Sequence, residues 1–104
     1  MAWLYLFIAG VFEVVWAFAM KQSLGFTKPL ATTITVIAMF VSFWLLAIAM
    51  RTIPLGTAYT IWTGIGAVGA FVLGIWFLGE PVTPQRVIAA AFIVTGLVLM
   101  KTAS

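Results

Sequence analysis

Four long apolar stretches, separated by short polar connectors, dominate this sequence of 104 residues. They cover residues 2–20, 30–50, 55–78 and 85–101. A helix needs about 20 residues to cross the hydrocarbon core, and the last stretch reaches this length if Gln85, Arg86 and Lys101 extend to the membrane surface. The sequence therefore predicts an all-α membrane protein with four transmembrane helices in one domain, residues 1–104.

Composition supports this class and excludes others. Apolar types make up 65% of the chain and charged types 7%, which leaves too little polar surface for a soluble globular protein. Without His or Cys the chain lacks the residues for zinc sites, thiol chemistry or histidine catalysis, so we expect no metal, no cofactor and no enzymatic activity. The five basic residues are dispersed, which argues against nucleic acid and leaves the lipid bilayer as the surroundings.

The connectors contain residues that end and begin helices. Pro29 and Pro54 lie in the first two connectors, and in the third Thr83 is placed to cap a helix that begins at Pro84. The segment 17–19 has the small-residue spacing of a signal-peptidase site. No Lys or Arg precedes the first apolar stretch, so we expect no cleavage there.

The basic residues divide almost equally between the two membrane sides. With four spans, Arg51 and Lys101 lie on one side, and Lys21, Lys28 and Arg86 lie on the other. Orientation follows the Lys and Arg bias between sides, and two against three is almost no bias. We expect both orientations to insert; the alternative is that one orientation prevails for reasons that this count does not capture.

Glu13 is the only charged residue in the interior of these stretches. An ionised carboxylate in hydrocarbon costs a few kcal/mol or more, so such residues usually face a water-filled cavity or an ion path. With no basic residue at that depth, its partner should be a proton or a bound cation, and holding each in turn is the minimum for coupled exchange. Four helices enclose little space, which favours a homodimer that brings two Glu13 together, antiparallel if both orientations insert. Alternatively, a permanently protonated Glu13 holds helices together.

Other polar and aromatic residues accompany Glu13. Gly10 and Trp16 lie three residues away on the same helix, and an indole beside a carboxylate can bind an organic cation. Ordinary packing is the alternative for Trp16, which is too deep for the interfacial belt. Ser42 is the only hydroxyl near the middle of the second span, where it can orient Glu13, bond substrate, or bond its own helix backbone.

The third span is the least lipid-like. Tyr59, Trp62, Thr63 and Gly66 recur at spacings of three and four, which gives one helical face a phenol, an indole and a hydroxyl suited to lining a site. Gly64 and Gly66 weaken the helix at its middle and predict a hinge. Close helix packing is the alternative explanation for the small residues of this span.

Taken together, these residues carry a family resemblance. The chain resembles the small multidrug resistance transporters along its whole length, through the first-helix glutamate, residues 54–59 (PLGTAY), Gly64 to Gly66, and residues 79–81 (GEP). Within that family, residues 13–17 (EVVWA), Ser42 and residues 62–67 (WTGIGA) are similar to the guanidinium exporter branch.

The resemblance implies a proton-coupled exporter of the plasma (inner) membrane that works as an antiparallel homodimer. Glu13 of both subunits would bind substrate or protons in turn, with the roles of the other residues implied as follows. Ser42 and Trp62 would hydrogen-bond or orient Glu13, Trp16 and Tyr59 would wall the cavity, Gly64 to Gly66 would be the hinge, and the last helices would dimerise. Ala89 and Gly96, seven residues apart on the last helix, indicate such a helix–helix seam.

Guanidinium suits a carboxylate because its planar fork makes two parallel hydrogen bonds. Thr60 stands where this branch is expected to have alanine, so we expect small substituted guanidinium or quaternary ammonium ions to be carried as well. A broad multidrug cation/proton antiporter of the same family is the alternative. A fluoride-type channel is disfavoured because Glu13 would repel the anion, and a structural or hole-forming protein would need neither Glu13 nor Ser42.

Overall fold

The computed structural model describes residues 1–103, and its regular structure consists of four α-helices. They are α1 (Ala2–Gln22), α2 (Pro29–Ala49), α3 (Leu55–Leu78) and α4 (Pro84–Thr102). Each is long and apolar enough to cross a membrane, so the prediction of four membrane-length helices is confirmed. The ends differ slightly from the apolar stretches: α1 continues to residue 22, and α4 runs from residue 84 to residue 102.

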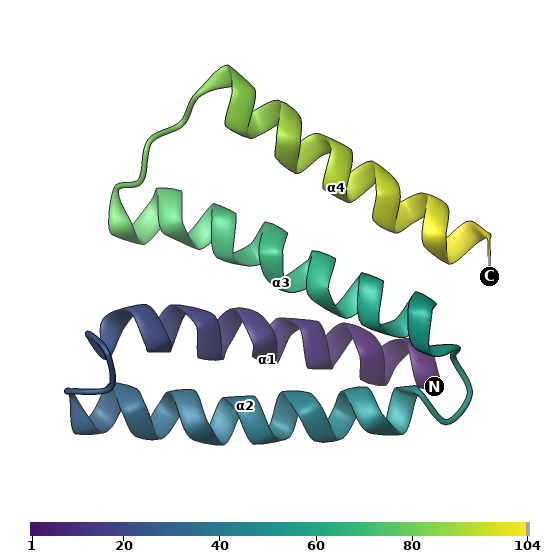
Figure 1. Ribbon diagram of the computed structural model, residues 1–104, viewed down its shortest axis with the longest axis horizontal. Coiled ribbons are helices and arrows are strands. Elements are labelled where there is room, and N and C mark those ends of the chain that lie inside the picture. The colour runs from purple at the N-terminus through teal and green to yellow at the C-terminus, as the bar shows by residue number, and fades with distance from the viewer. Residues whose placement is uncertain (104) are drawn as a thin grey trace.

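The first three helices pack against one another, and α4 packs on α3 at the edge of this group. Seen down the shortest axis, the helices follow in the order α2, α1, α3, α4, and α4 lies farther from α3 near their connector than at its C-terminal end (Figure 1). The molecule measures 39 × 34 × 17 Å, so it is about half as thick as it is wide. Large hydrophobic side chains from all four helices remain exposed on its surface.

Local sequence explains where the helices around the last connector end and begin. The hydroxyl oxygen of Thr83 accepts a hydrogen bond of 3.2 Å from the backbone N–H of Arg86, and Pro84 is the first helical residue. The predicted cap is therefore confirmed. Gly79 ends α3 with a φ of 66°, a left-handed conformation that costs glycine little. These two signals fix the turn that reverses the chain between α3 and α4.

The buried core lies between the first three helices and extends into the connector that follows α2. It consists of small and aliphatic side chains around one indole: Leu6, Ala9, Leu46, Ala49, Ile53, Ala58, Ile61 and Trp62. By contrast, α4 contributes no buried residue, and its backbone lies close to α3 alone among the described helices. α1, α2 and α3 thus form the part of the chain that positions the candidate site, with α4 at its edge.

Candidate functional site

Glu13 lies at the middle of α1, where this helix packs against α3. Its side chain is half-buried, and its Oε1 atom is buried without a hydrogen-bond partner from residues 1–103. A buried carboxylate oxygen that lacks a partner loses hydration and gains no hydrogen bond in return. This arrangement leaves Glu13 ready to take up a proton or a cationic donor.

The carboxyl group of Glu13 packs against the backbone of α3 at Gly66. A methyl group added at Gly66 would overlap the Glu13 carboxyl carbon and Oε1. Gly66 is itself buried, so the missing side chain provides the space in which the carboxylate lies. This close approach explains why glycine suits position 66 without any need for a bend in the helix.

Ser42 joins the three core helices. Fully buried on α2, its hydroxyl donates a hydrogen bond of 2.7 Å to the carbonyl oxygen of Ala9 on α1. The same oxygen accepts a hydrogen bond of 2.9 Å from the indole Nε1–H of Trp62 on α3. From the sequence, three partners were open for the Ser42 hydroxyl: Glu13, substrate, or the backbone of its own helix. The observed acceptor is instead the carbonyl oxygen of Ala9 on the neighbouring helix α1. Orientation of Glu13 by Ser42 and Trp62 stays a prediction.

Four aromatic rings follow one another beside this network. The ring of Trp16 meets Phe43 edge-on at a centroid distance of 6.3 Å, and Phe43 lies 5.7 Å from Trp62. Tyr59 continues the row at 5.5 Å from Trp62. The Nε1 atom of Trp16 is buried and has no hydrogen-bond partner in the described part of the chain. The Trp16 Nε1 atom thus resembles Glu13 Oε1 in being buried without a partner, and Trp16 lies about one helical turn from Glu13.

Phe43 is the one member of this row that no pattern in the sequence indicates. The residue is one of several aromatic side chains in an apolar helix, and such a residue carries no distinguishing pattern of its own. Its position directly after Ser42 was the available signal, because Ser42 had already been assigned to the candidate site.

Tyr59, Thr60 and Thr63 line a groove of about 500 Å³ between α3 and α4. All three side chains are exposed. Glu13 and Trp16 do not line this groove, so the structure divides the predicted site residues between two regions. Tyr59 belongs to both, since it also contacts Trp62 in the aromatic row.

The helix α3 is continuous through the predicted hinge at Gly64 and Gly66. The two glycines are two residues apart and face different neighbours, as a helix of about 3.6 residues per turn requires. Gly66 faces Glu13, whereas a methyl group at Gly64 would meet the end of the Leu97 side chain on α4. Close packing therefore explains glycine at both positions, and a hinge at Gly64 and Gly66 stays a prediction.

The remaining predicted positions are small residues at helix surfaces. Gly10 is buried against Ile65, and a methyl group there would come within 2.6 Å of the Ile65 Cγ2 atom. Ala89 and Gly96 on α4 are both exposed, and an added methyl group at Gly96 would meet open space. The absence of a side chain at Gly10 thus allows α1 to pack closely against α3. The surface of α4 that carries Ala89 and Gly96 is exposed and is not covered by another described helix.

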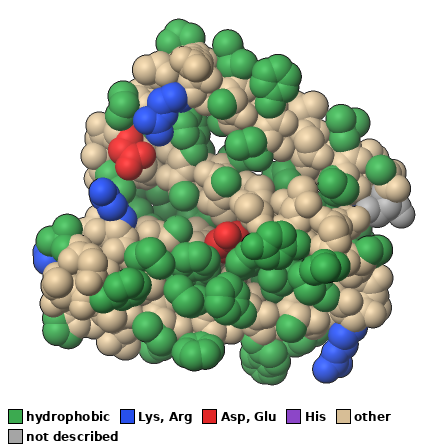
Figure 2. Space-filling view, viewed as in Figure 1, with side chains coloured by type: hydrophobic (Ala, Val, Ile, Leu, Met, Phe, Trp, Pro, Cys, Tyr) green, Lys and Arg blue, Asp and Glu red, His purple; other side chains and the backbone are tan. Residues whose placement is uncertain are grey.

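The other carboxylate, Glu80, is in a different setting. Its Oε1 lies 3.7 Å from a guanidinium nitrogen of Arg86, and both side chains are more than a third exposed. Figure 2 shows acidic side chains at two places on this face: one near the centre among hydrophobic side chains, the other beside basic side chains near the connection from α3 to α4. No group of three possible metal ligands occurs within residues 1–103.

Comparison with known proteins identifies the family. The family described as Small Multidrug Resistance protein matches residues 1–103. A guanidinium exporter from Escherichia coli (strain K12) is 52% identical over 101 residues, which cover 97% of this chain and 96% of the relative. Guanidinium exporters from Citrobacter freundii and Salmonella typhimurium are each 50% identical over the same shares of the two chains. The resemblance noted in the sequence is confirmed, and this multi-pass membrane protein belongs to the small multidrug resistance family.

Proposed function

We propose that this chain is a proton-coupled antiporter of the plasma membrane that exports guanidinium, together with small substituted guanidinium or quaternary ammonium ions. It is a transporter and not an enzyme, and its four helices act as one domain. Relatives named guanidinium exporter share about half of its residues over nearly the whole chain, which supports the substrate class. The four apolar helices support the membrane location.

The observation that carries the proposal is the environment of Glu13. Its Oε1 atom is buried without a partner from the described chain, and no basic residue shares its depth in the membrane. Guanidinium supplies both the positive charge and the N–H donors that such an oxygen lacks. A proton also neutralises the negative charge of the Glu13 carboxylate, so protons and guanidinium compete for the same group.

We propose an antiparallel homodimer because one chain does not enclose this carboxylate. Glu13 is only half-buried, and large hydrophobic side chains remain exposed on all four helices. A second subunit placed against the face that carries Glu13 would remove the carboxylate from lipid and bring two Glu13 side chains together. The exposed surface of α4 with Ala89 and Gly96 offers a seam between subunits.

In the proposed cycle, protons on Glu13 are released on one side of the membrane and guanidinium binds the freed carboxylates in their place. Trp16 and Tyr59 wall the cavity, and the Ser42 and Trp62 network keeps α1, α2 and α3 in register around it. The dimer then opens to the other side, where protons displace guanidinium. Two carboxylates that exchange protons for one monovalent cation make the transport electrogenic.

Uptake of labelled guanidinium into proteoliposomes tests this function. An imposed proton gradient should drive accumulation against the guanidinium gradient, and collapse of the proton gradient should stop it. A fluoride-type channel would pass the anion and ignore guanidinium, and a structural protein would move neither. Guanidinium uptake that is indifferent to the proton gradient would contradict the proposal.

The near-equal distribution of basic residues predicts that both orientations coexist. We expect Thr102→Lys combined with Ala103→Lys, next to Lys101, to force most chains into one orientation and to reduce exchange. Like-oriented chains cannot form the antiparallel pair. Exchange should return when a copy with the opposite bias is co-expressed, and C-termini of the unmodified chain labelled from one side only would rule out dual orientation.

Thr60 predicts the substrate range. Its side chain is exposed beside Tyr59, so its hydroxyl is open to a ligand and can compete for the hydrogen bonds that favour guanidinium. We expect Thr60→Ala to narrow the range toward guanidinium. Currents on a solid-supported membrane would compare guanidinium, phenylguanidinium and a tetra-alkylammonium, and an unchanged ratio among the three would remove Thr60 from the account.

A further inference from the structure

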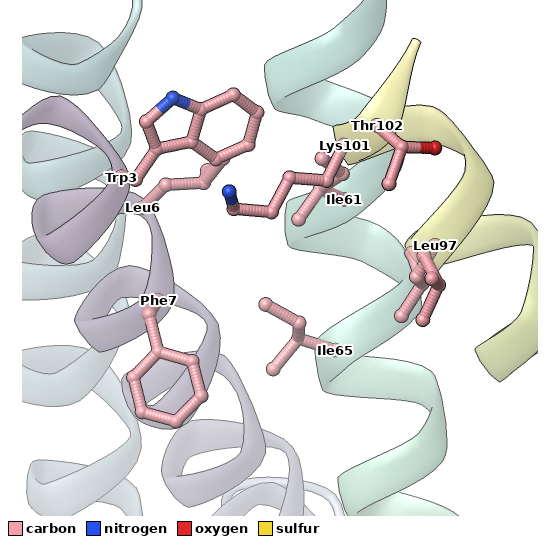
Figure 3. A pocket seen from close by; sticks show the side chains of 9 residues that line it. Trp3, Leu6, Phe7, Ile61, Ile65, Leu97, Lys101 and Thr102 are labelled. Atoms are coloured by element: carbon pink, nitrogen blue, oxygen red, sulfur yellow. The ribbon is translucent and has the colours of Figure 1, made fainter. Parts of the chain in front are cut away.

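A cleft of about 330 Å³ opens between α1, α3 and α4 at the end of the molecule where α1 begins and α4 ends (Figures 1 and 3). Its size is near the lower end of the range for ligand pockets, about 300–1,000 Å³. Glu13 and the other core site residues do not line it. The cleft is therefore separate from the proposed transport site.

Packing next to the cleft explains its position. α1 and α3 approach closely where Gly10 meets Ile65, and α3 approaches α4 where Gly64 meets Leu97. At this end of the molecule α4 lies nearer to α1 than it does at the connector after α3, but its backbone packs on α3 alone, so a space bordered by all three helices remains (Figure 1). Its walls are mostly hydrocarbon, with Leu6 and Phe7 from α1 and Ile61 from α3 among them.

One cation reaches across the mouth of this cleft. The Nζ atom of Lys101, in the last turn of α4, lies 4.9 Å from the centre of the Trp3 ring in the first turn of α1. Figure 3 shows the Lys101 side chain extending toward Trp3 across the space that Phe7 and Leu97 border. The only ion pair formed within residues 1–103 is the distant one of Arg86 with Glu80. Lys101 thus places a positive charge at membrane-surface depth, directly above an apolar slot.

We propose that this cleft binds an anionic phospholipid, with one acyl chain in the slot and the phosphate group at Lys101. An apolar cleft within the bilayer takes up hydrocarbon, and the ammonium above it selects for negative charge, as basic pockets between transmembrane helices do. Trp3 holds the glycerol region at the interface, where indoles are favoured. The lipid would fill the space between α1 and α4 and keep α4 at its present angle. The proposal does not depend on which substrate Glu13 binds.

Lipid retention tests the proposal. The full chain is reconstituted in vesicles of equal phosphatidylglycerol and phosphatidylcholine, extracted in a mild detergent, and analysed by native mass spectrometry for each lipid retained. We expect the unmodified chain to retain phosphatidylglycerol preferentially. Lys101→Gln should lower the ratio of phosphatidylglycerol to phosphatidylcholine about fivefold, the effect of one basic residue near a membrane surface, and Lys101→Arg should restore it. Arg51→Gln is the matched control, since Arg51 is basic but does not line the cleft.

A variant that fills the slot separates specific binding from general charge attraction. Val98 is exposed on α4 and lines the cleft, so Val98→Trp should fold and occupy the place of the acyl chain. We expect Val98→Trp to reduce the retention of both lipids. Equal effects of Lys101→Gln and Arg51→Gln on the lipid ratio would overturn the proposal. Unchanged lipid retention in Val98→Trp would also overturn it, and a simultaneous loss of dimer would assign the cleft to a second copy of the chain.

Discussion

Glu13→Gln should abolish proton-coupled exchange and weaken guanidinium binding about 10- to 100-fold, the usual effect of removing a hydrogen bond to a charged group. The amide has nearly the same shape as the carboxylic acid, so the variant should fold, but it cannot release a proton or carry the charge that attracts the cation. Guanidinium binding to the detergent-purified variant and currents in proteoliposomes measure the two losses separately.

Glu80→Gln is the matched control for this substitution. It removes the only other acidic side chain, which pairs with Arg86 in the connection between α3 and α4. This pair is more than a third exposed, so its contribution to stability is small. We expect exchange by Glu80→Gln to stay near that of the unmodified chain. Exchange by Glu13→Gln at the unmodified rate would remove Glu13 from the mechanism.

Gly66→Ala should reduce guanidinium binding and exchange roughly 10- to 100-fold while the protein still folds. The added methyl group takes the space of the Glu13 carboxyl group, and a flexible glutamate can move away from it. A displacement of about 1 Å in a functional group can cost this much activity. Alanine is also a better helix former than glycine by about 1 kcal/mol, so loss of helix stability does not explain the effect.

Two further glycines on α3 distinguish a packing role from a hinge. Gly56→Ala adds a methyl group in open space and should change neither binding nor exchange. Gly64→Ala presses on the end of the Leu97 side chain, away from Glu13. If α3 acts as a flexible hinge, Gly64→Ala and Gly66→Ala should both slow exchange and leave guanidinium binding intact. If Gly66 makes room for the carboxylate, only Gly66→Ala should weaken binding. Normal binding by Gly66→Ala would reject the packing role.

Much of the fold follows from patterns that lie within single helices. Hydropathy and length predict the four helices, because crossing a membrane requires one long apolar segment per helix. The cap at Thr83 and Pro84 is equally local, since the capped N–H belongs to Arg86, three residues farther along. The prominence of Glu13 is also visible in the sequence, because it stands alone among apolar residues.

Contacts between helices could not be predicted in the same way. The acceptor of the Ser42 hydroxyl is the backbone carbonyl of Ala9, and a backbone group leaves no mark on the residue type. The proximity of Gly66 to Glu13 depends on the register of α3 against α1, which intrahelical spacing does not determine. Without that register, the pair Gly64 and Gly66 indicated flexibility, whereas the structure gives each glycine its own close neighbour. The separation of α4 from α1 is likewise a property of packing.

Proton release on substrate binding shows directly whether Glu13 holds protons and guanidinium in turn. Guanidinium is added to the purified unmodified protein in weak buffer, at a pH low enough for Glu13 to be protonated, and a pH-sensitive dye records the protons released. We expect about two protons for each guanidinium bound, one from each Glu13 of the dimer, and none from Glu13→Gln. The affinity for guanidinium should also fall as the pH falls. Guanidinium binding without proton release, at an affinity independent of pH, would rule out competition of the two ligands for Glu13.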